Sequence, residues 1–345
     1  MNTKNSDGSV NRRDFIKILA MATAGIPSLS VTAYARKPNA EADVNEKTSM
    51  PYRKLGRTDL ISSRLVFGCG AALMGGSPER LLERAFEAGI NLYDIGSDIY
   101  YKGSEKNFAP FLQKHRDKIY VVSKAPALPF GYSSASMDTE QATYAAAYWT
   151  KLMDASLKDL QTDYMDAYYL MGVEDPALIH LEELHNAFQK ARTAGKVRYF
   201  GFSAHKNTQK VLEAAIQTGW YDLAMIGITP AGWYNWDKRS LEPGTPTLLQ
   251  LQNLLNSAKS AGMGLIGMKA VRFMASLWAG GKGNEGAFDR FYDKKLMASR
   301  LNPFQRAYAY VLMHGLDVVN ADMQNFKHLE ENITAVSTSH SYFSS

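Results

Sequence analysis

Hydrophobic residues follow two alternating patterns along this chain from about residue 64 onward. Short, nearly continuous apolar runs predict buried strands at 65–68, 91–95, 119–124, 165–170, 197–202, 223–227, 264–268 and 316–319. Longer segments carry apolar residues three or four positions apart, which predicts helices, among them 78–88, 139–160, 178–194, 208–218, 247–261 and 326–335. Eight strands that alternate with helices predict an α/β fold, a single-domain (β/α)8 TIM barrel.

The segments outside this alternation are assigned separately. Residues 51–63 should form a short hairpin that closes the bottom of the barrel, because Gly56 to Asp59 supplies turn residues between two extended pieces. The barrel domain is therefore expected at 51–340, and its least regular part, 273–302, is expected to cover the ligand side. Residues 36–50 are polar and lack periodicity, so we expect a flexible leader there.

The first 35 residues have the three parts of an export signal. Arg12 and Arg13 give a basic start, 18–31 is a short apolar run, and 33–35 reads Ala-Tyr-Ala, a cleavage-site pattern. The paired arginines followed by Phe15 resemble the twin-arginine signal, which addresses folded proteins to export. The apolar run is too short for a comfortable membrane span. The sequence thus predicts passage through the twin-arginine export machinery, and a soluble periplasmic protein with no stable membrane insertion after cleavage.

Composition excludes several classes of protein. Hydrophobic side chains make up 46% of the 345 residues and charged ones 21%, which suits one large core and argues against disorder. Cleavage after residue 35 removes four cationic and two acidic side chains, so the net charge falls from +5 to +3, too little to predict a nucleic-acid partner. Cys69 is the only cysteine, which excludes an intramolecular disulfide and a cysteine-rich metal site; no metal is expected.

Polar side chains stand where several predicted strands end, and reactive groups of TIM barrels collect at that face. Asp94 closes the second strand, Lys124 closes the third and Met171 follows the fourth, while Tyr100 and Tyr101 come shortly after Asp94. Taken alone, these residues favour a plain ion pair at the barrel mouth beside surface tyrosines.

The motifs around these residues resemble those of the aldo-keto reductases, in the same order, from about residue 52 to residue 335. The matching segments are 90–94, 118–124, 156–166 and 195–203. The resemblance implies that Asp94 anchors Lys124 and that Tyr100 or Tyr101 donates a proton during hydride transfer. A phenol with a pKa of about 10 is a poor acid near neutrality and needs such a cation beside it. Tyr100 requires the smaller insertion counted from Asp94, and the sequence leaves both tyrosines open.

Met171 is a departure from the family, which carries a histidine at that point. A thioether cannot donate a hydrogen bond to a substrate carbonyl. The change is compatible with a different substrate, with help from another residue such as His205, or with lost catalysis. Two functions therefore compete: an NAD(P)-dependent oxidoreductase that interconverts a carbonyl (aldehyde, ketone or oxidised sugar) and an alcohol, and a non-catalytic barrel that binds a dinucleotide or small ligand.

The resemblance also implies a nicotinamide dinucleotide, NADP(H) rather than NAD(H). The implied cofactor contacts, after strands five and seven and in the last helix, are Ser203, His205, Lys269, Lys327, Glu331 and Asn332. Ala204 replaces the family's common asparagine, and His328 stands where an arginine usually meets the 2′-phosphate. Phosphates favour helix N-termini and nearby cations, which makes Lys327 and His328 suitable partners.

Two further points concern the ligand. Gly68-Cys69-Gly70 suggests a doubly wound dehydrogenase, but the third glycine of that fingerprint is Leu73 here, so the signal fails. Met171 and Trp233 are expected to line the substrate pocket. Trp233 is one of four aromatic residues in loops that are expected at the mouth of this pocket, namely Trp220, Trp233, Tyr234 and Trp236.

Overall fold

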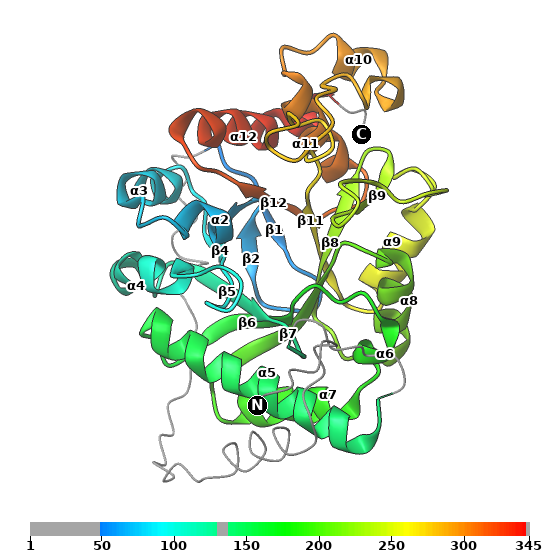
Figure 1. Cartoon of the computed structure of the whole chain (residues 1–345). Helices are drawn as coiled ribbons and strands as arrows, with labels where there is room; N and C mark the ends of the chain where they lie inside the picture. The colour runs from blue at the N-terminus through cyan, green and yellow to red at the C-terminus, as the bar shows by residue number, and fades with distance from the viewer. Residues whose placement is uncertain (1–48, 130–136, 343–345) are drawn as a thin grey trace, which may run out of the picture.

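A computed structural model describes residues 49–129 and 137–342, in which parallel strands close into a barrel with helices around it (Figure 1). The barrel strands are β3 (Leu65–Gly68), β4 (Leu92–Asp94), β5 (Tyr120–Ala125), β6 (Met165–Leu170), β7 (Val197–Ala204), β8 (Leu223–Thr229), β11 (Gly264–Met268) and β12 (Val318–Asp322). Each strand pairs in parallel with the next, and β12 pairs with β3 to close the ring. The predicted single-domain (β/α)8 barrel is confirmed.

Helices connect the strands along the outside of the barrel. The α-helices are α2 (Cys69–Leu73), α3 (Glu79–Glu87), α4 (Ser104–His115), α5 (Thr139–Leu160), α6 (Pro176–Ile179), α7 (Glu182–Thr193), α8 (Thr208–Thr218), α9 (Gln252–Ser260), α10 (Lys294–Met297), α11 (Pro303–Met313) and α12 (Phe326–Thr338), with 3-10 turns at Asp289–Phe291 and Ser339–Tyr342.

Several helix boundaries differ from the prediction. The helix predicted over 178–194 is two helices, α6 and α7, and the one predicted over 247–261 begins only at Gln252. The predicted helices did not include α2, α4, α10 and α11. Pro110 lies inside α4 and obscures its pattern. In contrast, α11 has a readable start, because Asn302 and Gln305 form a capping box around Pro303.

The predicted hairpin closes the bottom of the barrel. Its strands, β1 (Tyr52–Lys54) and β2 (Ile61–Ser63), are antiparallel. Leu55 and Leu60 are fully buried and join the side chains that fill the barrel interior. A second hairpin, β9 (Gly232–Asn235) and β10 (Ser240–Leu241), extends the sheet antiparallel to the end of β8 and was not predicted.

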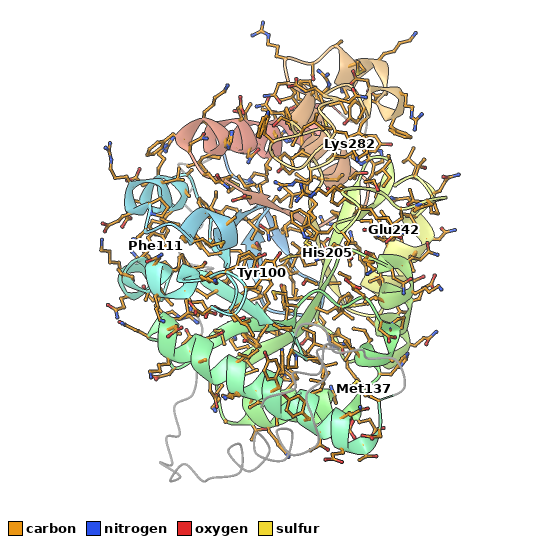
Figure 2. All side chains as sticks on the ribbon, in the orientation of Figure 1. Tyr100, Phe111, Met137, His205, Glu242 and Lys282 are labelled. Carbon is orange, nitrogen blue, oxygen red and sulfur yellow. The ribbon has the colours of Figure 1, made fainter. Side chains whose placement is uncertain are left out.

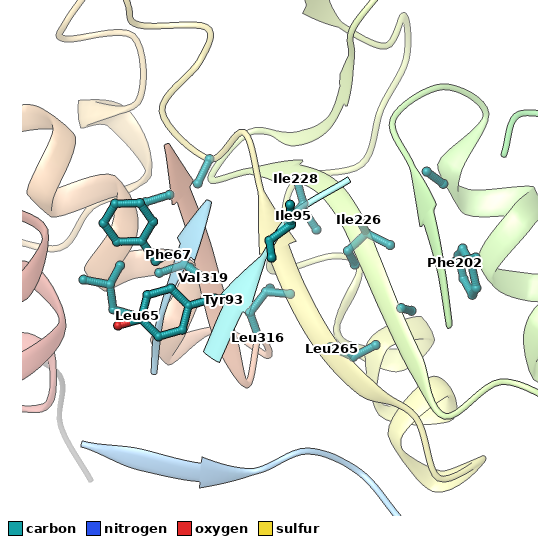
Figure 3. Packing of buried hydrophobic residues seen from close by; sticks show 14 of the residues in the cluster. Leu65, Phe67, Tyr93, Ile95, Phe202, Ile226, Ile228, Leu265, Leu316 and Val319 are labelled. Carbon is teal, nitrogen blue, oxygen red and sulfur yellow. The ribbon is translucent and has the colours of Figure 1, made fainter. Parts of the chain in front are cut away.

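The core has two layers, because successive strand residues point to opposite faces. Inward residues form the interior cluster of Val66, Leu92, Tyr120, Val122, Ala167, Tyr169, Leu223, Met225, Ile266, Met268 and Val318. Outward residues such as Leu65, Phe67, Tyr93 and Ile226 pack toward the helices (Figure 3). The inward positions become polar at the carboxyl ends of the strands, where Asp94, Lys124, Ser203 and Asn320 stand.

The N-terminal predictions are only partly within the described residues. The signal at 1–35 and residues 36–48 of the leader lie outside them. Met50 is described, and it is 5% exposed and packs into the outer core, so the end of the leader belongs to the barrel. Within 49–129 and 137–342, none of the helices combines the length and the hydropathy that crossing a membrane requires.

Candidate active site

A buried ion pair lies at the carboxyl ends of β4 and β5. The Lys124 Nζ donates to both carboxylate oxygens of Asp94, at 2.8 and 2.7 Å, and also to the Ile95 carbonyl. Both side chains are almost completely buried. Adjacent parallel strands place these two residues together, as the sequence predicted, and three acceptors fix the ammonium in one position.

Asn320 on β12 completes this pair, although sequence reasoning missed it. Its Nδ2 donates to the Asp94 Oδ2 at 2.6 Å and lies 3.5 Å from the Met225 sulfur. The amide therefore gives the Asp94 carboxylate a further hydrogen-bond donor beside Lys124. The signal was available, because Val318 is an inward position of the same strand and a polar residue two places later must also face the interior.

The structure separates the two candidate tyrosines. The Lys124 Nζ lies 5.3 Å from the centroid of the Tyr101 ring, whereas Tyr100 is 42% exposed and meets Tyr101 edge to face. The Tyr101 ring fits between Gly70 and Gly96: a Cβ at Gly70 would lie 2.5 Å from the ring, and one at Gly96 would also overlap it. The glycine slot thus directs Tyr101, rather than Tyr100, toward the ion pair.

The Tyr101 hydroxyl is a weaker acid than that of an ordinary tyrosine. Burial, followed by the negative charge of Asp94, raises the pKa of Tyr101 above its ordinary value. The Lys124 ammonium donates to Asp94 and to the Ile95 carbonyl and lies 5.3 Å from the centroid of the Tyr101 ring, and no described residue accepts a hydrogen bond from the Tyr101 hydroxyl. The phenol is therefore protonated at neutral pH and placed to donate.

Met171, Ser203 and His205 gather at the ends of β6 and β7. The Met171 amide donates to the Ala125 carbonyl at 2.9 Å, which keeps the chain in register with β5. The Ser203 Oγ accepts a hydrogen bond from the Gly172 amide at 3.0 Å, and so the serine ties the two strand ends together. His205 is half-buried, and desolvation followed by the charge of Lys269 lowers its pKa to about 4.

Cationic side chains surround Trp236 after β11. The Lys269 Nζ is 4.6 Å and the Arg272 Cζ 5.2 Å from the Trp236 ring, and a Cβ at Gly280 would lie 3.3 Å from Arg239. Burial, then the charges of Lys124 and Arg272, lowers the pKa of Lys269 to about 7. In the described part of the chain, no ion pair is formed by any of these three cations, so the cluster can accept an anion.

Lys269 also has an unusual backbone. Its φ is +62°, a left-handed conformation that side chains other than glycine rarely adopt. Such strain persists where the surrounding structure imposes it, and it occurs often at binding sites. The loop predicted to cover the ligand side packs here, through Gly280, against the guanidinium groups of Arg239 and Arg272.

The residues assigned to the last helix lie near the start of α12. Asn325 caps the helix by accepting from the His328 amide at 2.9 Å. Lys327 is exposed, and its Nζ lies 4.0 Å from Glu331, while Asn332 is buried. Asp322, at the end of β12, is an exposed carboxylate in the same region, and Gln324 donates to it at 3.0 Å.

Trp233 is not where the sequence placed it. It is 1% exposed, its Nε1 donates to Gln209 of α8 at 3.3 Å, and it belongs to the outer core. This corrects its assignment to the substrate pocket. Alternation along the β9 hairpin explains the difference, and the tryptophan that meets Lys269 and His205 is Trp236.

No cluster of three or more histidine, cysteine or acidic side chains that could hold a metal ion is found within 49–129 and 137–342. The chemistry available at the mouth is therefore an ammonium-carboxylate pair, a protonated phenol, a neutral imidazole and an anion-accepting cluster. A parallel eight-stranded barrel with such groups at the carboxyl ends of its strands is the arrangement of (β/α)8 barrel enzymes.

Comparison with known proteins gives the family. The family model described as "Aldo/keto reductase family" matches residues 76–274, more than half of the chain. The chain belongs to the aldo/keto reductase family. The oxidoreductase YqkF of Bacillus subtilis, itself uncharacterized, is 31% identical over 164 residues, which cover 45% of this chain and 49% of YqkF, so this match spans about half of each protein.

Two longer matches cover most of the barrel. A Glycine max protein named probable aldo-keto reductase 1 is 27% identical over 311 residues, 82% of this chain and 83% of the relative. The holo structure of an aldo-keto reductase from Bacillus halodurans superimposes with a TM-score of 0.60 at 23% identity, and covers 83% of this chain and 91% of that one. The structural likeness shows a shared fold.

Proposed function

We propose that this protein is a nicotinamide-dependent oxidoreductase that interconverts a carbonyl and an alcohol. The observation that carries the proposal is the buried Asp94–Lys124 pair beside the protonated phenol of Tyr101. A bound nicotinamide would supply or accept the hydride. The protein supplies the proton: in reduction Tyr101 gives its hydroxyl proton to the substrate oxygen, and the phenolate that remains is stabilised by the ammonium of Lys124.

Asp94 and Asn320 have supporting roles in this proposal. Asp94 holds the Lys124 ammonium in place, and Asn320 keeps Asp94 from turning away, since its amide binds the same carboxylate oxygen. Both act through Lys124 rather than on the substrate. A preorganised cation near a developing negative charge needs no rearrangement at the moment of reaction, which makes such groups effective.

The cofactor in this proposal is a nicotinamide dinucleotide, and the cluster of Lys269, Arg272 and Arg239 supports it. Three cations that pair with no described carboxylate match a diphosphate in charge. Ser203 and His205 would lie on the nicotinamide side. We propose NADP(H) as the preferred form, because Lys327 adds a cation and His328 a hydrogen-bonding side chain at the start of α12. The carboxylate of Asp322 lies in the same region and would repel a 2′-phosphate.

Export is also part of the proposal. The arginine pair, the apolar run and the Ala-Tyr-Ala site within residues 1–35 support transport through the twin-arginine machinery to the periplasm. Fractionation of a bacterium that expresses the full chain tests this directly. Arg12→Lys together with Arg13→Lys should keep the protein in the cytoplasm, and periplasmic accumulation of that double variant would contradict the twin-arginine route.

A second candidate is a barrel that binds a dinucleotide or small ligand without converting it. The observation in its favour is Met171, whose thioether cannot hydrogen-bond a carbonyl as a donor. A small carbonyl or alcohol is the substrate in the first proposal. In the second, the barrel would bind a dinucleotide or such a small molecule and leave it unchanged.

Nicotinamide fluorescence and turnover together separate these candidates. Purified mature protein is titrated with NADPH and with NADH, and oxidation of the cofactor is then followed with a panel of aldehydes, ketones and oxidised sugars. We expect binding, tighter for NADPH, and turnover that Lys124→Met lowers by at least about 100-fold without loss of binding. Binding with no turnover would favour the second candidate, and full activity in Lys124→Met would refute the proton transfer described above.

A further inference from the structure

The mouth of the barrel holds an imidazole that the proton transfer does not use. His205 directly follows β7, two residues after Ser203, so both face the same side of the strand. Figure 2 labels His205 and Tyr100, and both labels stand over the middle of the barrel in that view. The side chain therefore lies on the side of the molecule where Asp94, Lys124 and Tyr101 meet.

Two glycines lie near this imidazole, one on β8 and one just after the end of β6. A Cβ at Gly172, which follows Met171 at the end of β6, would be 3.9 Å from the His205 Nε2. A Cβ at Gly227 on β8 would be only 3.0 Å from the His205 Cβ. The lack of a side chain at Gly227 thus makes room for His205, and the His205 Nε2 lies within van der Waals distance of the Cβ position at Gly172, the residue after Met171.

The imidazole still has hydrogen-bonding capacity. Its Nδ1 is buried without a partner in the described part of the chain, and no described residue hydrogen-bonds its Nε2 either. The Trp236 ring packs against it at 6.2 Å. Burial and Lys269 lower the pKa of His205 to about 4, so the ring is neutral near pH 7. A neutral imidazole offers one donor and one acceptor, which suits an uncharged carbonyl or hydroxyl.

We infer that the His205 Nε2 hydrogen-bonds the substrate oxygen that Tyr101 protonates, and so is a second catalytic residue. The inference rests on the proposed oxidoreductase function and deepens it. During reduction the hydride goes to the carbonyl carbon and the Tyr101 proton goes to the oxygen, while His205 keeps its own proton and donates a hydrogen bond to the developing negative charge. Met171, one residue before Gly172, cannot donate this hydrogen bond because its thioether has no proton to give. His205, from the neighbouring strand, donates it instead.

The test compares two histidine-to-phenylalanine variants. His205→Phe keeps the ring and the contact with Trp236 but removes both nitrogens. His185→Phe is the matched control, because His185 lies on α7 and stacks on Trp220 at 4.5 Å, away from the mouth. We expect His205→Phe to lower kcat about 100-fold on the substrate found in the panel above, as loss of one donor to a developing oxyanion does. Its Tm should match that of the wild type, and its Kd for NADPH should rise by less than about threefold, since Ser203 and the cationic cluster remain. His185→Phe should keep full activity.

A second variant tests whether the two positions serve the same oxygen. Met171→His in the His205→Phe background returns an imidazole from β6, and recovery of kcat would support the assignment. Full activity in His205→Phe, or a weaker NADPH Kd with unchanged kcat, would overturn it, as would a double variant no more active than the single one. A wild type without turnover would refute the proposed function as well, whereas an active wild type with an unaffected His205→Phe refutes this inference alone.

Discussion

The two ends of the barrel differ in whether their charged side chains are paired within the chain. At the bottom, three aspartates repeat one arrangement. Asp166, Asp222 and Asp317 each accept a backbone N–H from the preceding barrel strand, at 2.8, 3.0 and 2.8 Å. Each also pairs with a cation, contributed by Arg198, Arg57 and Lys259 respectively. Charge and hydrogen-bonding capacity are satisfied there by the chain itself.

At the top, several charged and hydrogen-bonding side chains have no partner within the described residues. Lys269, Arg272 and Arg239 form no ion pair within the described residues. Five of the ten buried polar atoms that lack a partner in the described chain lie in the upper strands and their loops, namely Ser97 Oγ, Tyr169 Oη, His205 Nδ1, Tyr234 Oη and Arg272 Nε. Buried polar groups are normally paired, so such a concentration marks where a ligand binds. We infer from this comparison that the charged residues at the bottom stabilise the fold, whereas those at the top are available to bind ligand and to take part in catalysis.

The largest expected effect tests the top directly. Tyr101→Phe removes the proposed proton donor and should lower kcat about 100- to 10,000-fold. Burial and Asp94 raise the pKa of Tyr101, so the phenol carries its proton at neutral pH, whereas phenylalanine has no proton to give. Turnover of the best substrate in the panel is the measurement.

Tyr100→Phe is the control for this prediction. Tyr100 lies outside the slot that Gly70 and Gly96 form, and the variant should therefore keep its activity. The opposite result, loss in Tyr100→Phe and activity in Tyr101→Phe, would make Tyr100 the donor and would show that the slot has another purpose.

A matched pair of arginine variants tests both ends at once. Arg198 donates to the fully buried Asp166 at 3.0 Å and to Asp59 at 2.6 Å, so Arg198→Met leaves a buried carboxylate with less compensation. We expect it to lose about 3 kcal/mol of unfolding free energy, the lower end for a broken buried pair, because Arg116 still binds Asp166 at 3.1 Å. Binding of NADPH should be unchanged.

Arg272→Met should do the reverse. It removes a cation without a described ion-pair partner, so the unfolding free energy should not fall, while NADPH binding should weaken about tenfold, or ~1.4 kcal/mol. Urea unfolding and cofactor fluorescence measure the two effects. Destabilisation by Arg272→Met, or weaker NADPH binding by Arg198→Met, would contradict the division between the two ends.

The fold was predictable because it depends on local patterns. The eight strands were placed within two residues of their observed limits at nearly every end, since buried parallel strands are short apolar runs. The hairpin under the barrel followed from the turn residues after Gly56. The aspartates of the bottom were not recognised as a repeated device, because each depends on its neighbouring strand rather than on its own surroundings.

The site was predictable only where strand order fixed it. Asp94 and Lys124 meet because β4 and β5 are neighbours, and this could be expected from the sequence. The choice of Tyr101 over Tyr100 could not, since it depends on how the loop after β4 fits against Gly70. The same applies to Trp233, which was expected at the mouth together with Trp236. The β9 hairpin turns Trp233 into the core, and only Trp236 meets Lys269.

The smallest expected effect concerns pH at the top of the barrel. Desolvation and two neighbouring cations lower the pKa of Lys269 to about 7, so this lysine is charged below that pH and neutral above it. A diphosphate favours the charged form. The Kd for NADPH should therefore rise several-fold between about pH 6 and about pH 8, far below the titration range of ordinary lysines near pH 10.4. Lys269→Met should bind more weakly at pH 6 and lose the pH dependence, whereas a wild-type Kd that is flat over this range would place Lys269 outside the anion site.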